Sequence, residues 1–95
     1  MHVFYKPPFR RFVKKQKRSF QLAIEDETEK IQNNPFLGEA KKGDLSGFRV
    51  FKFKFQQTEY LVAYKFLNKE IIFYMIGTHE NFYRELKQYL KEVER

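Results

Sequence analysis

Residues 49–76 read RVFKFKFQQTEYLVAYKFLNKEIIFYMI, and this stretch decides the fold. Its first seven residues alternate, so that three phenylalanines lie on one side of an extended chain and Lys52 and Lys54 on the other. The next two runs, which begin at residues 58 and 70, carry apolar residues at both parities, as is typical of strands covered on both faces. Short polar turns separate the runs. The stretch therefore predicts three consecutive strands, the first with an aromatic face and a basic face.

The residues before this stretch are patterned for a short strand and two helices. HVFY (2–5) predicts the strand, and Pro7 and Pro8 predict the first turn of a helix, where proline is tolerated. Apolar residues then recur at helical spacing in two groups, and Ser19 is the predicted N-cap of the second group. The second helix is expected to end near Pro35. The opposite charges of the two helices favour an antiparallel hairpin.

The remaining segments complete a fold of the α+β class. Residues 35–47 hold three of the four glycines and predict a loop, and Thr78 is predicted to cap a last helix with Glu80 in its first turn. The apolar stripe of that helix is formed by Phe82, Leu86, Tyr89, Leu90 and Val93. The predicted order is β-α-α-β-β-β-α in one domain spanning residues 1–95. A helix hairpin and a C-terminal helix pack on a mostly antiparallel four-stranded sheet.

The charge is large and unevenly placed, which indicates a polyanionic partner. The formal net charge is +7, and residues 1–18 carry seven Lys and Arg with no Asp or Glu. Such a field attracts nucleic acid and also acidic proteins. With 12 Phe and 6 Tyr in 95 residues, the chain has enough apolar surface to fold despite this charge.

Several kinds of protein are excluded or disfavoured by what the sequence lacks. There is no Cys, which fits a reducing cytoplasm and rules out disulfides and thiolate metal sites. His2 and His79 are the only imidazoles and no metal-binding spacing occurs, so we expect no metal and no cofactor. No apolar run reaches signal-peptide length or the roughly 20 residues of a membrane span. We therefore expect a cytoplasmic protein without a membrane partner.

Three segments resemble the RelE/ParE superfamily of bacterial toxins. DLSGFRVFKF (44–53) is similar to the start of the family's second strand, and EYLVAY (59–64) to its hydrophobic strand ending in Tyr. IGTHENFYREL (76–86) is similar to the family's strand-to-helix segment. The resemblance implies the toxin of a type II toxin-antitoxin pair, with an acidic antitoxin as partner. It also implies that operator DNA is bound only through the antitoxin complex.

The resemblance and the residues together suggest a site for metal-independent RNA cleavage. This reaction needs a base for the 2′-OH proton, an acid for the 5′ leaving oxygen, and fixed positive charge for the transition state. We assign His79 as acid or base and Tyr83 as a phosphate or proton partner, since four residues apart in one helix they share a face. Lys52, Lys54 and Arg49 are the predicted stabilising cations.

Each assignment has a structural alternative. His79 is equally explained as a solvated residue of a helix start, and Tyr83 as a cover for the core. Lys52 and Lys54 also fit a solvated strand face without further function. Arg49 shares the parity of the phenylalanines and must lie at the edge of the strand or twist outward.

Two functions from different classes follow. The first is a ribosome-dependent endoribonuclease that cuts mRNA and arrests translation, in which case the protein is an enzyme. The second is a ParE-like inhibitor that traps DNA gyrase without catalysis. Ribosome-dependent nucleases of the family usually carry an Arg in the third strand, shortly before its Tyr, whereas this chain has Leu61, Val62 and Ala63 there. We favour the nuclease because the Gly-Thr-His spacing has a chemical use.

Overall fold

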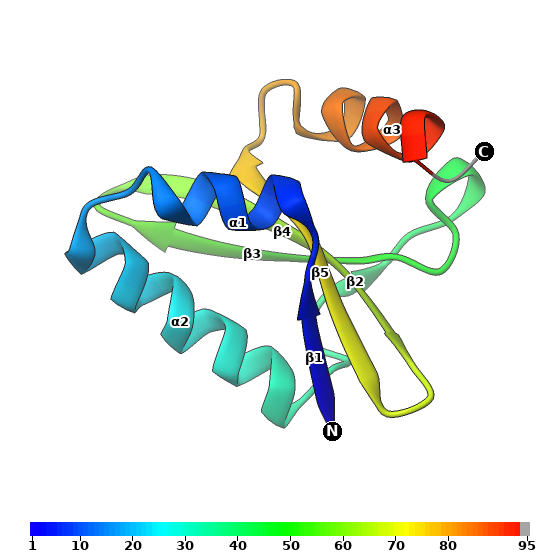
Figure 1. Cartoon of the computed structure of the whole chain (residues 1–95), viewed down its shortest axis with the longest axis horizontal. Helices are drawn as coiled ribbons and strands as arrows, with labels where there is room; N and C mark the ends of the chain where they lie inside the picture. The colour runs from blue at the N-terminus through cyan, green and yellow to red at the C-terminus, as the bar shows by residue number, and fades with distance from the viewer. Residues whose placement is uncertain (94–95) are drawn as a thin grey trace.

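A computed structural model describes residues 1–93, and residues 94–95 of the predicted domain lie outside this part. The sequence of elements agrees with the predicted order apart from one added strand (Figure 1). In chain order the elements are β1 (His2–Tyr5), α1 (Pro7–Lys14), α2 (Arg18–Asn33), β2 (Glu39–Ala40), a 3₁₀ turn (Gly43–Leu45), β3 (Arg49–Phe55), β4 (Thr58–Leu67), β5 (Glu70–Thr78) and α3 (Phe82–Val93). The predicted α+β class is confirmed.

The sheet has five strands in the order β1-β5-β4-β3-β2, and it is mixed, because β1 runs parallel to β5 while the other pairs are antiparallel. The prediction of four strands was therefore wrong in number. The added strand β2 lies inside the predicted loop 35–47, where Glu39 pairs with Val50 and Ala40 with Arg49. Two residues show no periodicity, so pairing with β3 creates this strand and its own sequence does not reveal it.

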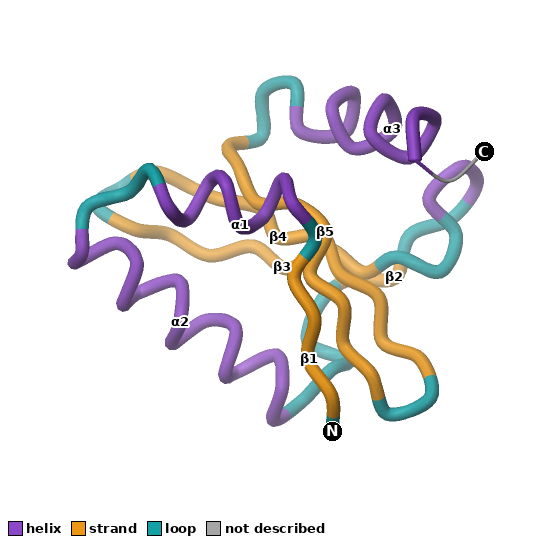
Figure 2. The backbone as a smooth tube through the Cα atoms, viewed as in Figure 1, coloured by secondary structure: helices purple, strands orange, loops and turns teal. Residues whose placement is uncertain are grey.

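The two faces of the sheet are covered by different elements. We call the face under α1 and α2 the hairpin face and the other the α3 face; Figures 1 and 2 show the helices on either side of the strands. The buried residues of the hairpin face are Phe9, Phe20, Ile24, Ile31, Phe53, Val62, Tyr64, Ile71, Phe73 and Ile76. Those of the α3 face are Leu45, Phe48, Val50, Leu61, Ala63, Tyr74, Met75, Phe82 and Leu86. The predicted aromatic side of β3 packs on the hairpin face.

A bulge in β5 changes which of its side chains face each side of the sheet. Ala63 pairs with Met75 and Tyr64 with Phe73, so Tyr74 has no residue opposite it in β4. Tyr74 and Met75 consequently both join the α3 face, and the alternation changes phase after them. This change of phase determines which side chains reach the α3 face at the end of β5.

Both predicted N-caps were wrong. The second helix begins at Arg18 after Lys17, so Ser19 lies within its first turn. β5 runs on through Thr78, and α3 begins only at Phe82. Glu80 accordingly lies in the connecting turn, and Glu85 is the acidic residue of the first helical turn. The pairing of Thr78 with Tyr60 of β4 satisfies its backbone in the sheet and leaves it no role as a helix cap.

The helix hairpin forms without salt bridges between its helices. The described residues contain three salt bridges, and none joins α1 to α2. The amide of Gln21 instead donates a hydrogen bond to the Val13 carbonyl at 2.9 Å, and Phe12 packs edge-on against Phe20. Apolar packing therefore holds the hairpin. Within residues 1–93, no helix combines the length and the apolar character that crossing a membrane requires.

Candidate functional site

The basic side of β3 lies on the α3 face. Val50 is buried in the α3-face core, and Lys52 and Lys54, two and four residues further along, are exposed on the same side. Lys52 pairs across the sheet with Leu61, and Leu61 with Gly77 of β5. Leu61 is fully buried. Lys52 thus lies beside a buried apolar residue near the end of β5, where the chain turns towards α3, whereas Lys54 pairs with the exposed Glu59 of β4.

His79 and Tyr83 meet at this end of β5, although His79 is not helical. His79 lies in the bend between β5 and α3, and its carbonyl accepts a hydrogen bond from the Phe82 amide at 3.3 Å. The turn is completed by Asn81 in the left-handed region, with φ of 67°. The rings of His79 and Tyr83 stand edge to face with centroids 5.9 Å apart. The structure therefore brings these two predicted site residues together.

Two further residues of this site, Glu39 and Lys41, did not emerge from the sequence. Lys41 Nζ donates a hydrogen bond to Glu39 Oε1 at 2.6 Å, and the same ammonium lies 5.3 Å from the centroid of the Tyr83 ring. Lys52 is close enough to Glu39 to act on its charge. The alternation Glu-Ala-Lys was a signal that the two side chains share one side of an extended segment. Their contact with Tyr83 could not be predicted, because residue 83 is far from both in the sequence.

Electrostatics keep both members of this pair charged. The hydrogen bond from Lys41 and its positive charge lower the pKa of Glu39, with a smaller contribution from Lys52. The hydrogen bond to Glu39 raises the pKa of Lys41, and Tyr83 contributes in the same direction. At neutral pH the site therefore presents an ionised carboxylate next to ammonium groups.

Arg49, the fifth predicted site residue, is separated from the others. Its side chain lies on the hairpin-face side of β3, where Nη1 donates hydrogen bonds to the carbonyls of Gly38 at 2.7 Å and Phe36 at 3.4 Å. The guanidinium also stacks over the Phe36 ring at 4.9 Å. Arg49 therefore fastens the segment between α2 and β2 to the sheet, and the structure does not place it with Lys52 and Lys54.

Tyr64 holds the same segment from within the core. Its buried hydroxyl donates to the Pro35 carbonyl at 2.6 Å and accepts a hydrogen bond from the Gly38 amide at 2.9 Å. A Cβ on Gly38 would lie 2.8 Å from the Tyr64 ring and hydroxyl, so only glycine fits. Burial raises the pKa of Tyr64. Because β2 follows directly after Gly38, this contact also fixes the strand that carries Glu39.

Residues 61–63 of β4, where ribosome-dependent nucleases of the family usually carry an Arg, offer no cation to the site. Leu61, Val62 and Ala63 are all buried, two of them on the α3 face and Val62 on the hairpin face. No group of three potential metal-ligating side chains occurs among residues 1–93. The side chains that gather at the site, Glu39, Lys41, Lys52, Lys54, His79 and Tyr83, supply one imidazole, one phenol, one carboxylate and three ammonium groups, which suit proton transfer and anion stabilisation.

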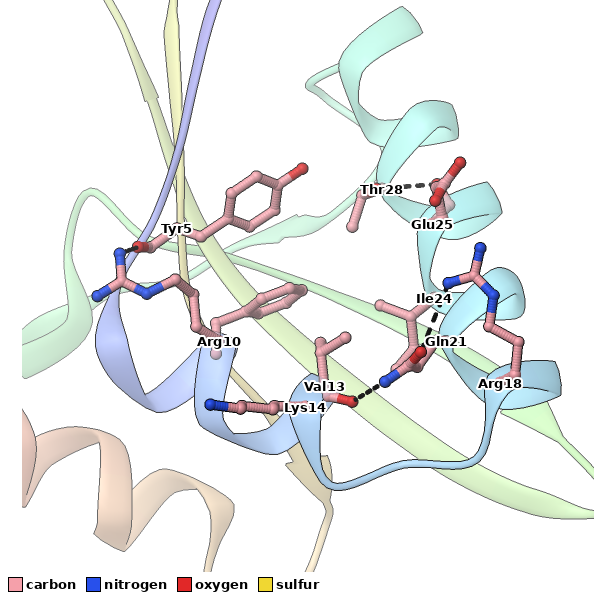
Figure 3. A pocket seen from close by; sticks show the side chains of 10 residues that line it. Tyr5, Arg10, Val13, Lys14, Arg18, Gln21, Ile24, Glu25 and Thr28 are labelled. Atoms are coloured by element: carbon pink, nitrogen blue, oxygen red, sulfur yellow. Dashed lines mark hydrogen bonds between the residues drawn. The ribbon is translucent and has the colours of Figure 1, made fainter.

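A second candidate site is a pocket between α1 and α2, with a volume of about 360 Å³ (Figure 3). Phe9, Val13 and Ile24 supply apolar surface. Tyr5, the last residue of β1, lies at one end of the pocket. Three cations, Arg10, Lys14 and Arg18, and one acid, Glu25, line it, and none of the cations forms a salt bridge with a described acid. Apolar surface surrounded by positive charge suits an acidic segment with an apolar side chain.

Three solved structures have a fold similar to that of this chain. The intact E. coli RelBE toxin-antitoxin complex matches with a TM-score of 0.64 at 10% identity, covering 81% of this chain and 94% of that chain. The isolated E. coli RelE toxin matches with a TM-score of 0.62 at 12% identity, covering 94% and 98%. The conserved hypothetical protein HP0894 from Helicobacter pylori matches with a TM-score of 0.51 at 19% identity, covering 84% and 96%. The mixed sheet with its helix hairpin and last helix is thus a RelE-like fold.

A family model identifies the family itself. The model for the ParE-like toxin of type II bacterial toxin-antitoxin systems matches residues 3–87, which is most of the chain. The chain therefore belongs to the ParE-like toxins of the RelE/ParE superfamily, and its place in such a system implies an antitoxin partner. No curated protein matches it in sequence.

Proposed function

We propose that this toxin arrests translation by cutting ribosome-bound mRNA in the cytoplasm. One observation carries the proposal: Lys52, Lys54, Glu39 with Lys41, and the His79–Tyr83 pair gather on the α3 face. The imidazole, carboxylate and ammonium groups supply what metal-independent phosphodiester cleavage requires. The likeness to RelE supports the fold on which this site is built.

The reaction assigned to these groups is an internal transesterification. A base, Glu39 or His79, removes the 2′-OH proton, and the 2′ oxygen attacks the adjacent phosphorus. The bond from phosphorus to the 5′ oxygen breaks, and an acid returns a proton to the leaving oxygen: His79 if Glu39 is the base, and the Tyr83 hydroxyl if His79 is the base. The products are a 2′,3′-cyclic phosphate and a free 5′-hydroxyl. Lys52 and Lys54 stabilise the extra negative charge on phosphorus in the transition state.

The alternative is a ParE-like inhibitor of DNA gyrase, and two observations favour it. The matching family model is that of the ParE-like toxins, and the strand position that usually carries an Arg in ribosome-dependent nucleases is occupied by buried apolar residues. On this hypothesis the basic α3 face binds an acidic surface or DNA without catalysis.

Induction of the toxin in bacteria distinguishes the two functions. We expect new mRNA 5′ ends phased with codons, appearing within minutes, while plasmid supercoiling stays unchanged. His79→Ala and Tyr83→Phe should each lose this cleavage by about 10²- to 10⁴-fold, as for a general acid or base, and remain folded. Intact mRNA together with gyrase-linked DNA breaks would reject the nuclease and support the inhibitor.

We further propose that the antitoxin covers the pocket between α1 and α2 and the basic α3 face. A partly disordered acidic segment that folds on binding would neutralise the excess positive charge and bury the exposed apolar side chains. The complex, and not the free toxin, is then the form that binds operator DNA.

A charge reversal within one helix tests this surface. Lys14→Glu should weaken the complex with the cognate antitoxin markedly, since Lys14 lines the pocket. Lys15→Glu is the matched control, because this neighbouring lysine instead lines the cavity between α1 and α3. Equal weakening by both variants would show that only net charge matters and would place the antitoxin elsewhere.

A further inference from the structure

Lys41 occupies a central place on the α3 face. Its backbone amide donates to the Phe48 carbonyl at 2.9 Å, which extends the pairing of β2 with β3 by one residue and fixes the direction of the side chain. The Lys41 side chain is only 22% exposed, whereas that of its partner Glu39 is 76% exposed. A lysine this enclosed has given up most of its rotamer freedom, which is unusual for a surface lysine.

The ammonium of Lys41 connects groups from two elements. On one side it holds the Glu39 carboxylate at 2.6 Å, and on the other it lies over the Tyr83 ring at 5.3 Å. Tyr83 in turn stands against His79 with ring centroids 5.9 Å apart. A continuous chain of contacts therefore runs from β2 to the bend before α3. Partial desolvation strengthens a cation–π contact of this kind.

A second charged contact joins the segment after β2 to α3. Lys87 lies 3.9 Å from Asp44, but both side chains are exposed, so this ion pair contributes little. Phe82 and Leu86 anchor the helix in the core, and the Phe82 ring stands edge to face with the half-buried Tyr83 ring, with centroids 5.3 Å apart. The Lys41 ammonium also lies over the Tyr83 ring and is the charged group that links this ring to the segment after β2.

We propose that Lys41 is a positioning residue, which holds Tyr83 beside His79 and Glu39 beside Lys52 in the geometry that RNA cleavage needs. The proposal rests on the proposed nuclease function. Lys41 acts through its neighbours, so its loss disturbs their placement and not the fold. Misplacement of reacting groups by about 1 Å typically costs about 10²-fold in rate.

Three variants separate positioning from charge. Lys41→Met keeps the apolar stem and removes the ammonium, and Lys41→Arg keeps a cation that can stack on Tyr83 and bind Glu39. Lys42→Met removes the same charge from the adjacent, exposed residue and is the matched control. Each variant is assayed for cleavage of mRNA on purified ribosomes, and the His79 and Tyr83 ring resonances are followed by NMR.

We expect Lys41→Met to lower the cleavage rate at saturating ribosome by about 10²-fold, with the half-saturating concentration little changed. Its His79 and Tyr83 resonances should shift, whereas those of Lys42→Met should not, and Lys41→Arg should restore most of the rate. A loss confined to the half-saturating concentration, an equal loss in Lys42→Met, or unshifted ring resonances would overturn the proposal. If the wild type cleaves no ribosome-bound mRNA, the nuclease function fails, and the resonances still decide the role of Lys41.

Discussion

The hairpin face and the α3 face are built from alternate residues of the same strands, and their polar groups differ in use. On the hairpin side the guanidinium of Arg49 and the hydroxyl of Tyr64 both form hydrogen bonds with the backbone of residues 35–38. On the α3 side Lys52, three residues after Arg49, is exposed and forms no hydrogen bond or salt bridge with the described residues.

The difference follows the position of each cation on the strand, since Arg49 and Lys52 lie on opposite sides of β3. A cation that donates hydrogen bonds to backbone carbonyls of its own chain is held in place and stabilises the fold. A cation at the opposite parity keeps its donors for a phosphate. The hairpin face should therefore control stability and the α3 face toxicity.

The largest expected effect is on activity. The double variant Lys52→Ala, Lys54→Ala should lose cleavage by about 10²- to 10³-fold, since it removes preorganised donors to the developing charge. The free energy of unfolding should change by only about 0.5 kcal/mol for each exposed lysine. Urea denaturation and mapping of mRNA 5′ ends measure the two quantities. Full cleavage by the folded double variant would remove these lysines from the site.

Arg49→Met should show the opposite behaviour. It removes charge-assisted hydrogen bonds to the carbonyls of Gly38 and Phe36, at a cost of about 1.5–3 kcal/mol in the free energy of unfolding. Lys52→Met on the same strand is the control and should change stability by at most about 0.5 kcal/mol. Should both variants unfold at the same urea concentration, the division of labour between the faces would be wrong.

The sequence predicted those features of the two faces that depend on residues close together in the chain, and missed those that depend on contacts between distant segments. The alternation of Phe and Lys in β3 and the stripes of α1 and α2 are local periodicities, and the structure confirmed the faces that they predicted. The sequence also showed that Arg49 lies on the same side of β3 as the phenylalanines. Its acceptors at residues 36 and 38 were not, since only the folded chain brings that segment to β3.

The parts that escaped prediction depend on pairing between strands. β2 exists because two residues extend the sheet beside Arg49 and Val50, and the bulge at Tyr74 exists because β5 must match the register of β4. The contact of Lys41 with Tyr83 follows from both, since it joins the end of β2 to the helix after β5. Residues 41 and 83 share no local pattern that could have linked them.

Tyr64→Phe tests the hydrogen bonds that the buried Tyr64 hydroxyl forms on the hairpin face. Its effect on the free energy of unfolding should depend on pH. Loss of the hydroxyl leaves the Gly38 amide without its partner and should cost about 1–3 kcal/mol near neutral pH. Because burial raises the pKa of Tyr64, the folded state favours the neutral phenol. Its stabilisation is complete below the ordinary pKa of about 10 and is lost as pH rises through the folded pKa.

The difference between wild type and Tyr64→Phe should therefore narrow above about pH 10, and denaturation of both proteins over this range measures it. Comparison of the two cancels the ionisation of the other tyrosines and lysines. A gap that stayed constant would mean that the Tyr64 hydroxyl ionises as readily in the folded chain as in the unfolded one.

The smallest effect concerns the turn between β3 and β4, which belongs to neither face. Gln56 and Gln57 connect the strands with φ of 48° and 69°, a left-handed pair that glycine adopts without strain at the second position. Gln57→Gly should raise the free energy of unfolding by up to about 1 kcal/mol, and Gln57→Ala, which keeps a Cβ, should not. Cleavage activity should stay at the wild-type level in both variants, because a change in the stability of this turn leaves the site on the α3 face unaltered. A change in activity that followed the change in stability would show that the two faces are coupled through β3.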